Sequence, residues 1–558
     1  MPLPPSGNTA WPPVQLAIPH ADMDMWRAWY SGNTDHLAAV YGGPANYRSN
    51  AVARQFFDVD RRRAVGGDEL RMFWGQETAP GQQAAKLHIP LGGDIAEMSA
   101  NLLWSDVPQV TVDADSTDAA TAKSTTAQIG RYLDDRGHAK LREGSELTAG
   151  LSNVYLRVVW DVTLRPRPWL DVIAPEGVVP EWRWGALAAA TVWRELDPLK
   201  DANEVWRLLE HHTPGTIEYG IYRGDVSTLG ARMEFVDHPD SEFLGKMKGV
   251  DSQGRQATGI PRLLITHLPN VLPNRVWEGV PGTAPLGRSD FAGVEPMMDA
   301  LDESWTSWMR DLRLGKARLL LPQSMLDTDG PGKGSSFNLE QEVRVALNML
   351  DEGSAKDAIT EVQFKIRVEE HEATCKALRL QILSSAGYSA QGFGEAGTIA
   401  ATATEVVARK EESLTTRGTK ILYQRPALIE LLATMMMVDV RHCGAKGVDP
   451  AAELTASWPQ AVQPDQEATA RALSLFDSAG AISTFMKVKL REPSWDDTAV
   501  MEEVQRIRED KAGAVPAGDP FSVPDEDPDE VGAVEEAGAG SDEGQGEDDD
   551  APVEKVAA

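Results

Sequence analysis

Two stretches of the sequence decide the fold, because each predicts a long helix. Residues 291–321 read FAGVEPMMDALDESWTSWMRDLRLGKARLLL, and residues 367–388 read RVEEHEATCKALRLQILSSAGY. In the first stretch large apolar residues recur at alternating spacings of four and three, which places them on one helical face over about five turns. This apolar seam consists of Val294, Met298, Leu301, Trp305, Trp308 and Leu312. Charged residues such as Asp299, Asp302 and Arg310 lie off it.

The second stretch predicts a returning helix, with Val368, Cys375, Leu378 and Ile382 on one face. Between the two helices lies a small insert that begins near the apolar residues 319–321, continues through a Gly-rich loop at 327–336, and includes a segment at 340–350 and a predicted strand at 359–368. The sequence therefore predicts helix, compact α/β insert, helix. A lone hairpin would leave much of its apolar surface in water, so we expect neighbouring copies to cover it in an oligomer.

The part before residue 290 predicts an α+β domain. Two short helices are expected over residues 24–41, around a turn at Ser31-Gly32-Asn33, and further helices over 92–107 and 117–149. From residue 154 the period changes, and short strands separated by Pro and Gly turns are expected up to residue 194. The same mixed β character continues over 204–270.

The part after residue 388 is predicted to be mainly helical. A loop at 389–397 precedes a long helix over 398–440, which Pro426 interrupts and kinks. A strand near 454–458 and helices over 467–479 and 496–510 follow. From about residue 512, Gly, Pro, Asp and Glu dominate, so a disordered acidic tail is expected.

Length and charge limit the classes of function. The chain has 558 residues, 42% of them hydrophobic, which is enough for several cores and roughly two to four domains. Its net charge is -31; Asp519 to Ala558 supply fifteen acidic residues against Lys555 alone, about -14, and the rest carries about -17. This balance argues against a protein that wraps nucleic acid by phosphate neutralisation. It is compatible with DNA sliding past an acidic wall that prevents sticking.

Targeting features favour a cytoplasmic origin, and the two cysteines indicate neither a disulfide framework nor a zinc site. No run approaches the ~20 uncharged apolar residues of a membrane span, and the first residues, MPLPP, do not resemble a signal peptide. Cys375 and Cys443 have no cysteine or convincing ligand pattern nearby, so both are interpreted as packing residues.

The motifs that suggest chemistry are weak. Residues 392–397, GFGEAG, satisfy the GxGxxG spacing of dinucleotide-binding loops, but the preceding segment is predicted to be helical and no βαβ unit frames it. A nucleotide-binding enzyme that uses this loop is the alternative to a structural role. His371-Glu372 lacks the second histidine of a zinc motif, and Asp327 and Asp329 lack the later ligands of a calcium loop. We therefore expect no catalytic residue, metal or cofactor.

The order of elements resembles that of a portal protein of tailed double-stranded DNA bacteriophages. Residues 86–96, KLHIPLGGDIA, and 310–318, RDLRLGKAR, are also similar to portals from phages of actinobacteria. The resemblance implies a portal-type fold whose parts are an N-terminal arm and wing at 1–290, stem helices at 291–322 and 367–389 around a clip at 323–366, a tunnel loop at 390–397, a long kinked wing helix at 398–440, a crown at 441–511 and an acidic tail at 512–558. The tail is a departure, and the family supplies no role for it.

What the resemblance implies about function is a ring, usually of twelve copies, at one vertex of the virion capsid, assembled in the host cytoplasm. Genome DNA passes through the ring during packaging and ejection; terminase docks on it first, and head-tail connector or adaptor proteins follow. Major capsid and scaffold proteins are further partners, and no membrane is involved. The expected channel loop comprises Gln391, Gly392, Phe393, Gly394, Glu395 and Gly397. Arg310, Arg313, Lys316 and Arg318 are candidates for phosphate-facing rings, with salt bridges between subunits as an equal alternative.

Overall fold

The computed structural model describes residues 3–42, 73–76, 86–113, 117–199, 204–247, 249–314, 318–321, 343–345, 360–362, 367–394, 403–459, 466–492 and 497–513. The fold is mixed α+β and about half helical, which confirms the predicted α+β class, whereas the portal-type architecture stays a prediction. The chain divides into two compact units, residues 1–463 and 464–558.

The N-terminal helices follow the predicted pattern. Gly32 separates helix α1 (Ala17–Ser31) from helix α2 (Thr34–Gly42). Its φ of 63° lies in the left-handed region, and this conformation ends α1. The Asn33 side chain accepts hydrogen bonds from the backbone N–H groups of Asp35 and His36 and so caps α2. Helix α5 (Leu91–Trp104) is the one expected after Gly92.

The predicted helical stretch at 117–149 forms two helices. Helix α6 (Ala119–Tyr132) and helix α7 (His138–Leu151) are joined by a π-helical turn, Leu133–Gly137. The Asp118 side chain caps α6 by accepting from the N–H of Thr121 at 3.0 Å.

Two antiparallel sheets contain most of the described strands of the first unit. The smaller has the order β11-β3-β4, from β3 (Asn153–Val159), β4 (Trp169–Ile173) and β11 (Ile265–Pro269). The larger has the order β1-β9-β8-β7-β6-β5, with β10 paired to β8. Its strands are β1 (Gly7–Ala10), β5 (Val178–Arg183), β6 (Ala186–Leu196), β7 (Val205–Thr213), β8 (Thr216–Gly224), β9 (Thr228–Met233) and β10 (Arg255–Ala257).

Short helical segments lie between the longer elements of this unit. They are η1 (Val14–Leu16), η2 (Phe73–Gly75), η4 (Pro175–Gly177), η5 (Phe235–Asp237), η6 (Pro239–Ser241) and α8 (Glu242–Lys246).

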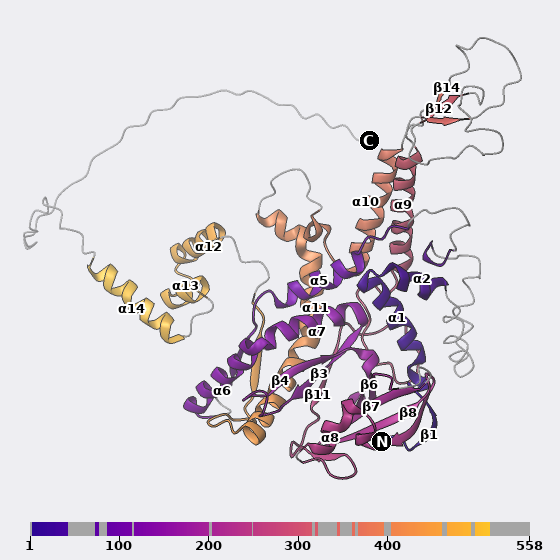
Figure 1. Cartoon of the computed structure of the whole chain (residues 1–558). Helices are drawn as coiled ribbons and strands as arrows, with labels where there is room; N and C mark the ends of the chain where they lie inside the picture. The colour runs from indigo at the N-terminus through magenta and orange to yellow at the C-terminus, as the bar shows by residue number, and fades with distance from the viewer. Residues whose placement is uncertain are drawn as a thin grey trace, which may run out of the picture. The chain divides into compact units, whose positions relative to one another are not determined.

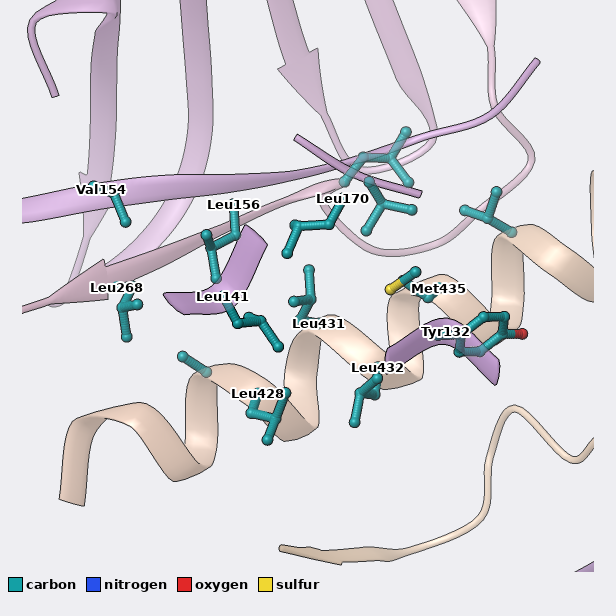
Figure 2. Packing of buried hydrophobic residues seen from close by; sticks show 14 of the residues in the cluster. Tyr132, Leu141, Val154, Leu156, Leu170, Leu268, Leu428, Leu431, Leu432 and Met435 are labelled. Carbon is teal, nitrogen blue, oxygen red and sulfur yellow. The ribbon is translucent and has the colours of Figure 1, made fainter. Parts of the chain in front are cut away.

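The long helix α11 (Ala403–Val438) runs through Pro426 and continues into a π-helical turn, Asp439–Cys443. The predicted interruption at the proline therefore does not end the helix. Figure 2 shows Leu428, Leu431 and Met435 of α11 beneath the β11-β3-β4 sheet, where they meet side chains such as Leu156. This contact is the centre of the main hydrophobic core.

One helical segment in the described part of the chain, Glu411–Cys443, has the length and hydropathy of a membrane span. Its most apolar window is 56% buried inside the protein. The core that this helix forms with the sheet accounts for its apolar residues.

The predicted pair of long helices is present, and Figure 1 shows them side by side. They are α9 (Glu295–Leu314) and α10 (Val368–Ala386). The described residues of the insert between them form a sheet of order β13-β12-β14, from β12 (Arg318–Leu321), β13 (Val343–Val345) and β14 (Thr360–Val362). Within the segment at 340–350, for which the sequence predicted no type, residues 343–345 pair with β12 as a parallel strand. Val368 begins α10 and does not end a strand.

The C-terminal region differs in two ways from the prediction. Strand β15 (Leu454–Ser457) pairs with β2 (Gln109–Val112), so these residues belong to the first unit, although the sequence grouped them with the crown. The second unit contains α12 (Gln466–Ser478), α13 (Thr484–Arg491) and α14 (Asp497–Gly513), of which α13 was not predicted. The acidic tail lies outside the described residues beyond 513.

Candidate functional site

Helices α9 and α10 form an antiparallel hairpin. Contacts between the two helices and their flanking residues at both ends of the hairpin establish this arrangement. At the insert end, Asp311 Oδ2 accepts from Arg367 Nη2 at 3.3 Å and lies 3.0 Å from His371 Nε2. At the opposite end, Tyr388 donates its hydroxyl to Asp290 Oδ2 at 2.7 Å. The insert therefore connects the C-terminal end of α9 to the N-terminal end of α10, and the loop after α10 lies at the opposite end of the hairpin.

The apolar seam of α9 is buried at one end and exposed at the other. Val294, Met298 and Leu301 are buried, Trp305 and Trp308 are half-buried, and Leu312 is 38% exposed. On α10, Cys375 and Ile382 are buried as predicted, but Val368 is 41% exposed. Exposure of apolar side chains thus rises toward the insert.

Two tryptophans mark the point where the seam opens. The rings of Trp305 and Trp308 meet edge to face with centroids 5.2 Å apart, and Trp308 lies parallel to His371 at 6.1 Å. The indole N–H of Trp308 is buried and has no hydrogen-bond partner among the described residues.

A second, polar face of α9 carries contacts that the sequence did not predict. Glu295, Asp299 and Asp302 are buried, and with Thr306 they recur at helical spacing, forming a polar stripe. From the sequence alone, Asp299 and Asp302 are two charged residues off the apolar seam. Their shared spacing with Glu295 was a signal of a common face, but their partners lie more than two hundred residues upstream.

The polar stripe binds N-terminal segments. Asp302 accepts from Trp74 Nε1 at 3.0 Å and from the Ile89 N–H at 2.9 Å, and its Oδ2 lies 2.7 Å from His88 Nδ1. Asp299 accepts from the backbone N–H groups of Phe73 and Trp74.

At the two ends of the stripe, Glu295 accepts from Trp26 Nε1 at 2.7 Å, and Thr306 accepts from the Leu87 N–H at 3.0 Å. Burial raises the pKa of Glu295 and of Asp299, and the hydrogen bonds that each accepts oppose this rise. The N-terminal segments thus clamp the base of the hairpin.

A buried ion pair joins the hairpin to the rest of the first unit. Lys420 of α11 donates to Asp290 Oδ2, which also accepts from Tyr388, and to the hydroxyl of Ser99 on α5. Both charged side chains are almost fully buried, at 3% and 4% exposure. Burial lowers the pKa of Lys420, and the neighbouring carboxylate of Asp290 opposes this. Four segments distant in sequence therefore meet at one charge pair.

The predicted channel loop is described as far as Gly394. Residues Ala390–Phe393 form a 3-10 turn, and Gly394 is left-handed at φ 84°. Phe393 packs on the core beside the hairpin, and its carbonyl accepts from Arg379 at 3.1 Å. A Cβ on Gly392 would lie 3.1 Å from the Met98 side chain. Gln391 lies in the turn, while Glu395 and Gly397 are outside the described residues.

The loop lacks the context of a dinucleotide-binding fingerprint within the described residues. Helix α10 precedes it and ends at Gly387, whereas the fingerprint needs a strand leading into the glycines. In the part of the chain that the structure describes, no group of three or more His, Cys, Asp or Glu is arranged to hold a metal ion.

The four predicted basic residues are described unequally. Arg310 and Arg313 are exposed near the insert end of α9, and neither forms an ion pair with another described residue. Lys316 lies outside the described residues, and Arg318 is in β12 with its side chain outside them.

Comparison with known proteins assigns no family. No protein-family model matches the chain, and no curated protein matches it.

Proposed function

We propose that this chain is the subunit of a bacteriophage portal, a ring at one capsid vertex through which genome DNA is packaged and ejected. One observation carries the proposal: an antiparallel helical hairpin bears a small sheet at one end and, at the other, a glycine-containing turn followed by a long helix through an α+β body. In the proposed architecture α9 and α10 are the stem, β12 to β14 belong to the clip, and the turn at Ala390 is the tunnel loop.

The exposure gradient along the stem supports assembly. Leu312 and Val368 are 38% and 41% exposed, and both lie toward the insert, where the hairpin has no cover from the described body. Apolar side chains in that position lose unfavourable contact with water when a neighbouring copy packs on them. A ring of copies, usually twelve in this family, supplies such a neighbour to every stem.

Charge supports a channel that DNA traverses without being held. The chain carries a net charge of -31, about -14 of it in the tail, so its overall field repels phosphate. Arg310 and Arg313 are exposed on the stem without described carboxylate partners, which suits brief phosphate contacts in a ring. The chemistry required is positioning, so the proposal assigns no bond-making step and no cofactor to the subunit.

The partners follow from the proposed role. Terminase docks on the clip during packaging, and head-tail connector or adaptor proteins take its place afterwards. Major capsid and scaffold proteins surround the ring in the virion, which assembles in the host cytoplasm.

Negative-stain microscopy of the purified chain tests the proposal. Rings with a central hole are expected. Dispersed single chains under assembly conditions contradict it, and calorimetric binding of ATP or NAD at micromolar affinity would favour a nucleotide-dependent enzyme instead.

A further inference from the structure

One tryptophan of the first unit takes no part in its core. Trp184 is 99% exposed, whereas Trp182 and Trp193 on the same hairpin pack against hydrophobic clusters. It stands at the tip of the β5–β6 hairpin, in the two-residue turn between the paired residues Arg183 and Ala186.

The backbone at this tip disfavours a bulky side chain. Trp184 has φ 50° and Gly185 has φ 82°, so both turn residues are left-handed. Such turns favour Asn, Asp or Gly at the first position, because other side chains are strained there. A tryptophan that costs conformational energy and gains no contact within the subunit is suited to a contact outside it.

The same sheet has a depression toward the edge opposite β5. A cavity of about 330 Å³ opens between β8, β9, β10 and the turn at Phe235, and its lining includes Glu218, Arg232, Met233, Phe235 and Arg255. In the strand order β5 is one edge, while β8, β9 and β10 lie toward the other. The tip and the depression are therefore different surfaces of one subunit.

Arg232 is held as a flat platform in this depression. Its Nη1 lies 3.5 Å from Glu218 Oε1, and its Nη2 donates to the carbonyls of Tyr219 at 3.1 Å and Gln253 at 3.0 Å. The side chain is still 35% exposed. These contacts fix the position of a guanidinium that is still partly exposed, and the face of a guanidinium is suited to stacking on an aromatic ring, for which tryptophan is the best partner.

We propose that Trp184 of one copy inserts into the depression of the next copy and stacks on Arg232. The inference rests on the proposed ring and specifies one of its contacts. The apolar walls of Met233 and Phe235 cover the indole, and the carboxylates of Glu218 and Glu234 are acceptors for its N–H. A contact between two different surfaces is heterologous, and repeating it by rotation closes a ring.

The test uses the full chain and its concentration-dependent assembly, measured by mass photometry. Trp184→Asn removes the indole and places a favoured residue in the turn, so folding is preserved. Arg232→Gln removes the guanidinium on which the indole would stack. Phe243→Asn is the matched control, because it replaces another exposed aromatic residue, on α8 and 53% exposed, with the same amino acid.

Each of Trp184→Asn and Arg232→Gln is expected to raise the concentration for half-assembly about three- to tenfold, and the double variant no further, because both remove the same contact. Phe243→Asn leaves it unchanged. The inference is overturned if Trp184→Asn forms rings at the same concentration as the wild type. It is also overturned if the two substitutions raise the concentration for half-assembly additively in the double variant. Either result points to another partner for Trp184. A wild-type chain that forms no ring contradicts the proposed function itself.

Discussion

Lys420 and Asp290 are the buried charges on which the base of the hairpin depends. The ammonium has two described acceptors and the carboxylate three donors, counting Asn270 Nδ2 at 2.7 Å. A buried pair adds little stability over apolar residues of the same shape, but removal of one partner leaves the other charge uncompensated.

Lys420→Met is therefore expected to lower the unfolding free energy by about 3 to 5 kcal/mol in urea denaturation. Adding Asp290→Asn removes the orphaned charge and keeps an acceptor for Tyr388, so the double variant regains part of the loss. Lys376→Met, at an exposed position of α10, is the matched control and stays within about 0.5 kcal/mol of wild type. Equal stability of wild type and Lys420→Met contradicts the role given to this pair.

His267 supplies a pH dependence at the residue scale. Its ring lies between Tyr155 and Trp182, with Nε2 buried and unpaired among the described residues, and burial lowers its pKa to about 3. The unfolded chain takes up a proton at this histidine below pH 6.5, whereas the folded chain does so only near pH 3. Stability is therefore retained above pH 6.5 and falls as the pH drops toward 3.

For His267→Phe, the loss of unfolding free energy between pH 7 and pH 5 should be smaller than in wild type by about 1 to 2 kcal/mol. His36→Gln on α2, near the surface, should leave the wild-type dependence in place. An unchanged slope in His267→Phe means that this histidine is not kept neutral by burial.

At the element scale, helix α9 makes contacts through two different faces. The apolar seam packs on the core at one end, and the polar stripe binds the segments at 73–76 and 86–90. The stripe orients the hairpin because its acceptors take backbone N–H groups at fixed positions.

Asp302→Ala should lower the unfolding free energy by about 2 to 4 kcal/mol, since it leaves the buried Trp74 Nε1 and the partly buried Ile89 N–H without an acceptor. Glu303→Ala, one residue further and exposed, is the control and changes stability by less than about 0.5 kcal/mol. Hydrogen exchange on the same variants should report faster exchange of the Ile89 amide in Asp302→Ala alone. Protection at Ile89 equal to wild type contradicts the clamp.

The elements with strong periodicity could be predicted from the sequence, and the contacts between distant segments could not. The seam of α9, the two helices around Gly32 and the strands after Asn153 follow from local pattern. Strand β13 spans three residues and helix α13 spans eight, so neither is long enough for a periodic pattern to stand out in the sequence. The polar stripe was missed because a carboxylate is normally solvated, and its donors come from elsewhere in the chain.

The same reason explains the base of the hairpin. Lys420 and Asp290 are 130 residues apart, and nothing in the local sequence of either indicates that they pair. The long helix predicted around Pro426 does continue through it, because packing of α11 on the sheet outweighs the lost hydrogen bond.

At the scale of the whole molecule, the proposed portal subunit has a net negative charge and a stem with exposed arginines. The net charge of -31 predicts weak binding to duplex DNA, although DNA is the proposed cargo. Fluorescence anisotropy with a short duplex near 0.15 M salt should give a dissociation constant weaker than about 10⁻⁴ M. Micromolar binding in the same buffer would mean that the protein holds DNA, and a sliding channel would be the wrong description.

The arrangement of the stem in the assembled particle tests the central claim most directly. Cryo-electron microscopy of the purified assembly should reveal a closed ring with a central hole, α9 and α10 around the hole, and the turn at Gln391 to Gly394 nearest the axis. Particles without a hole, or rings in which α9 and α10 face outward and the turn lies away from the axis, would contradict the account.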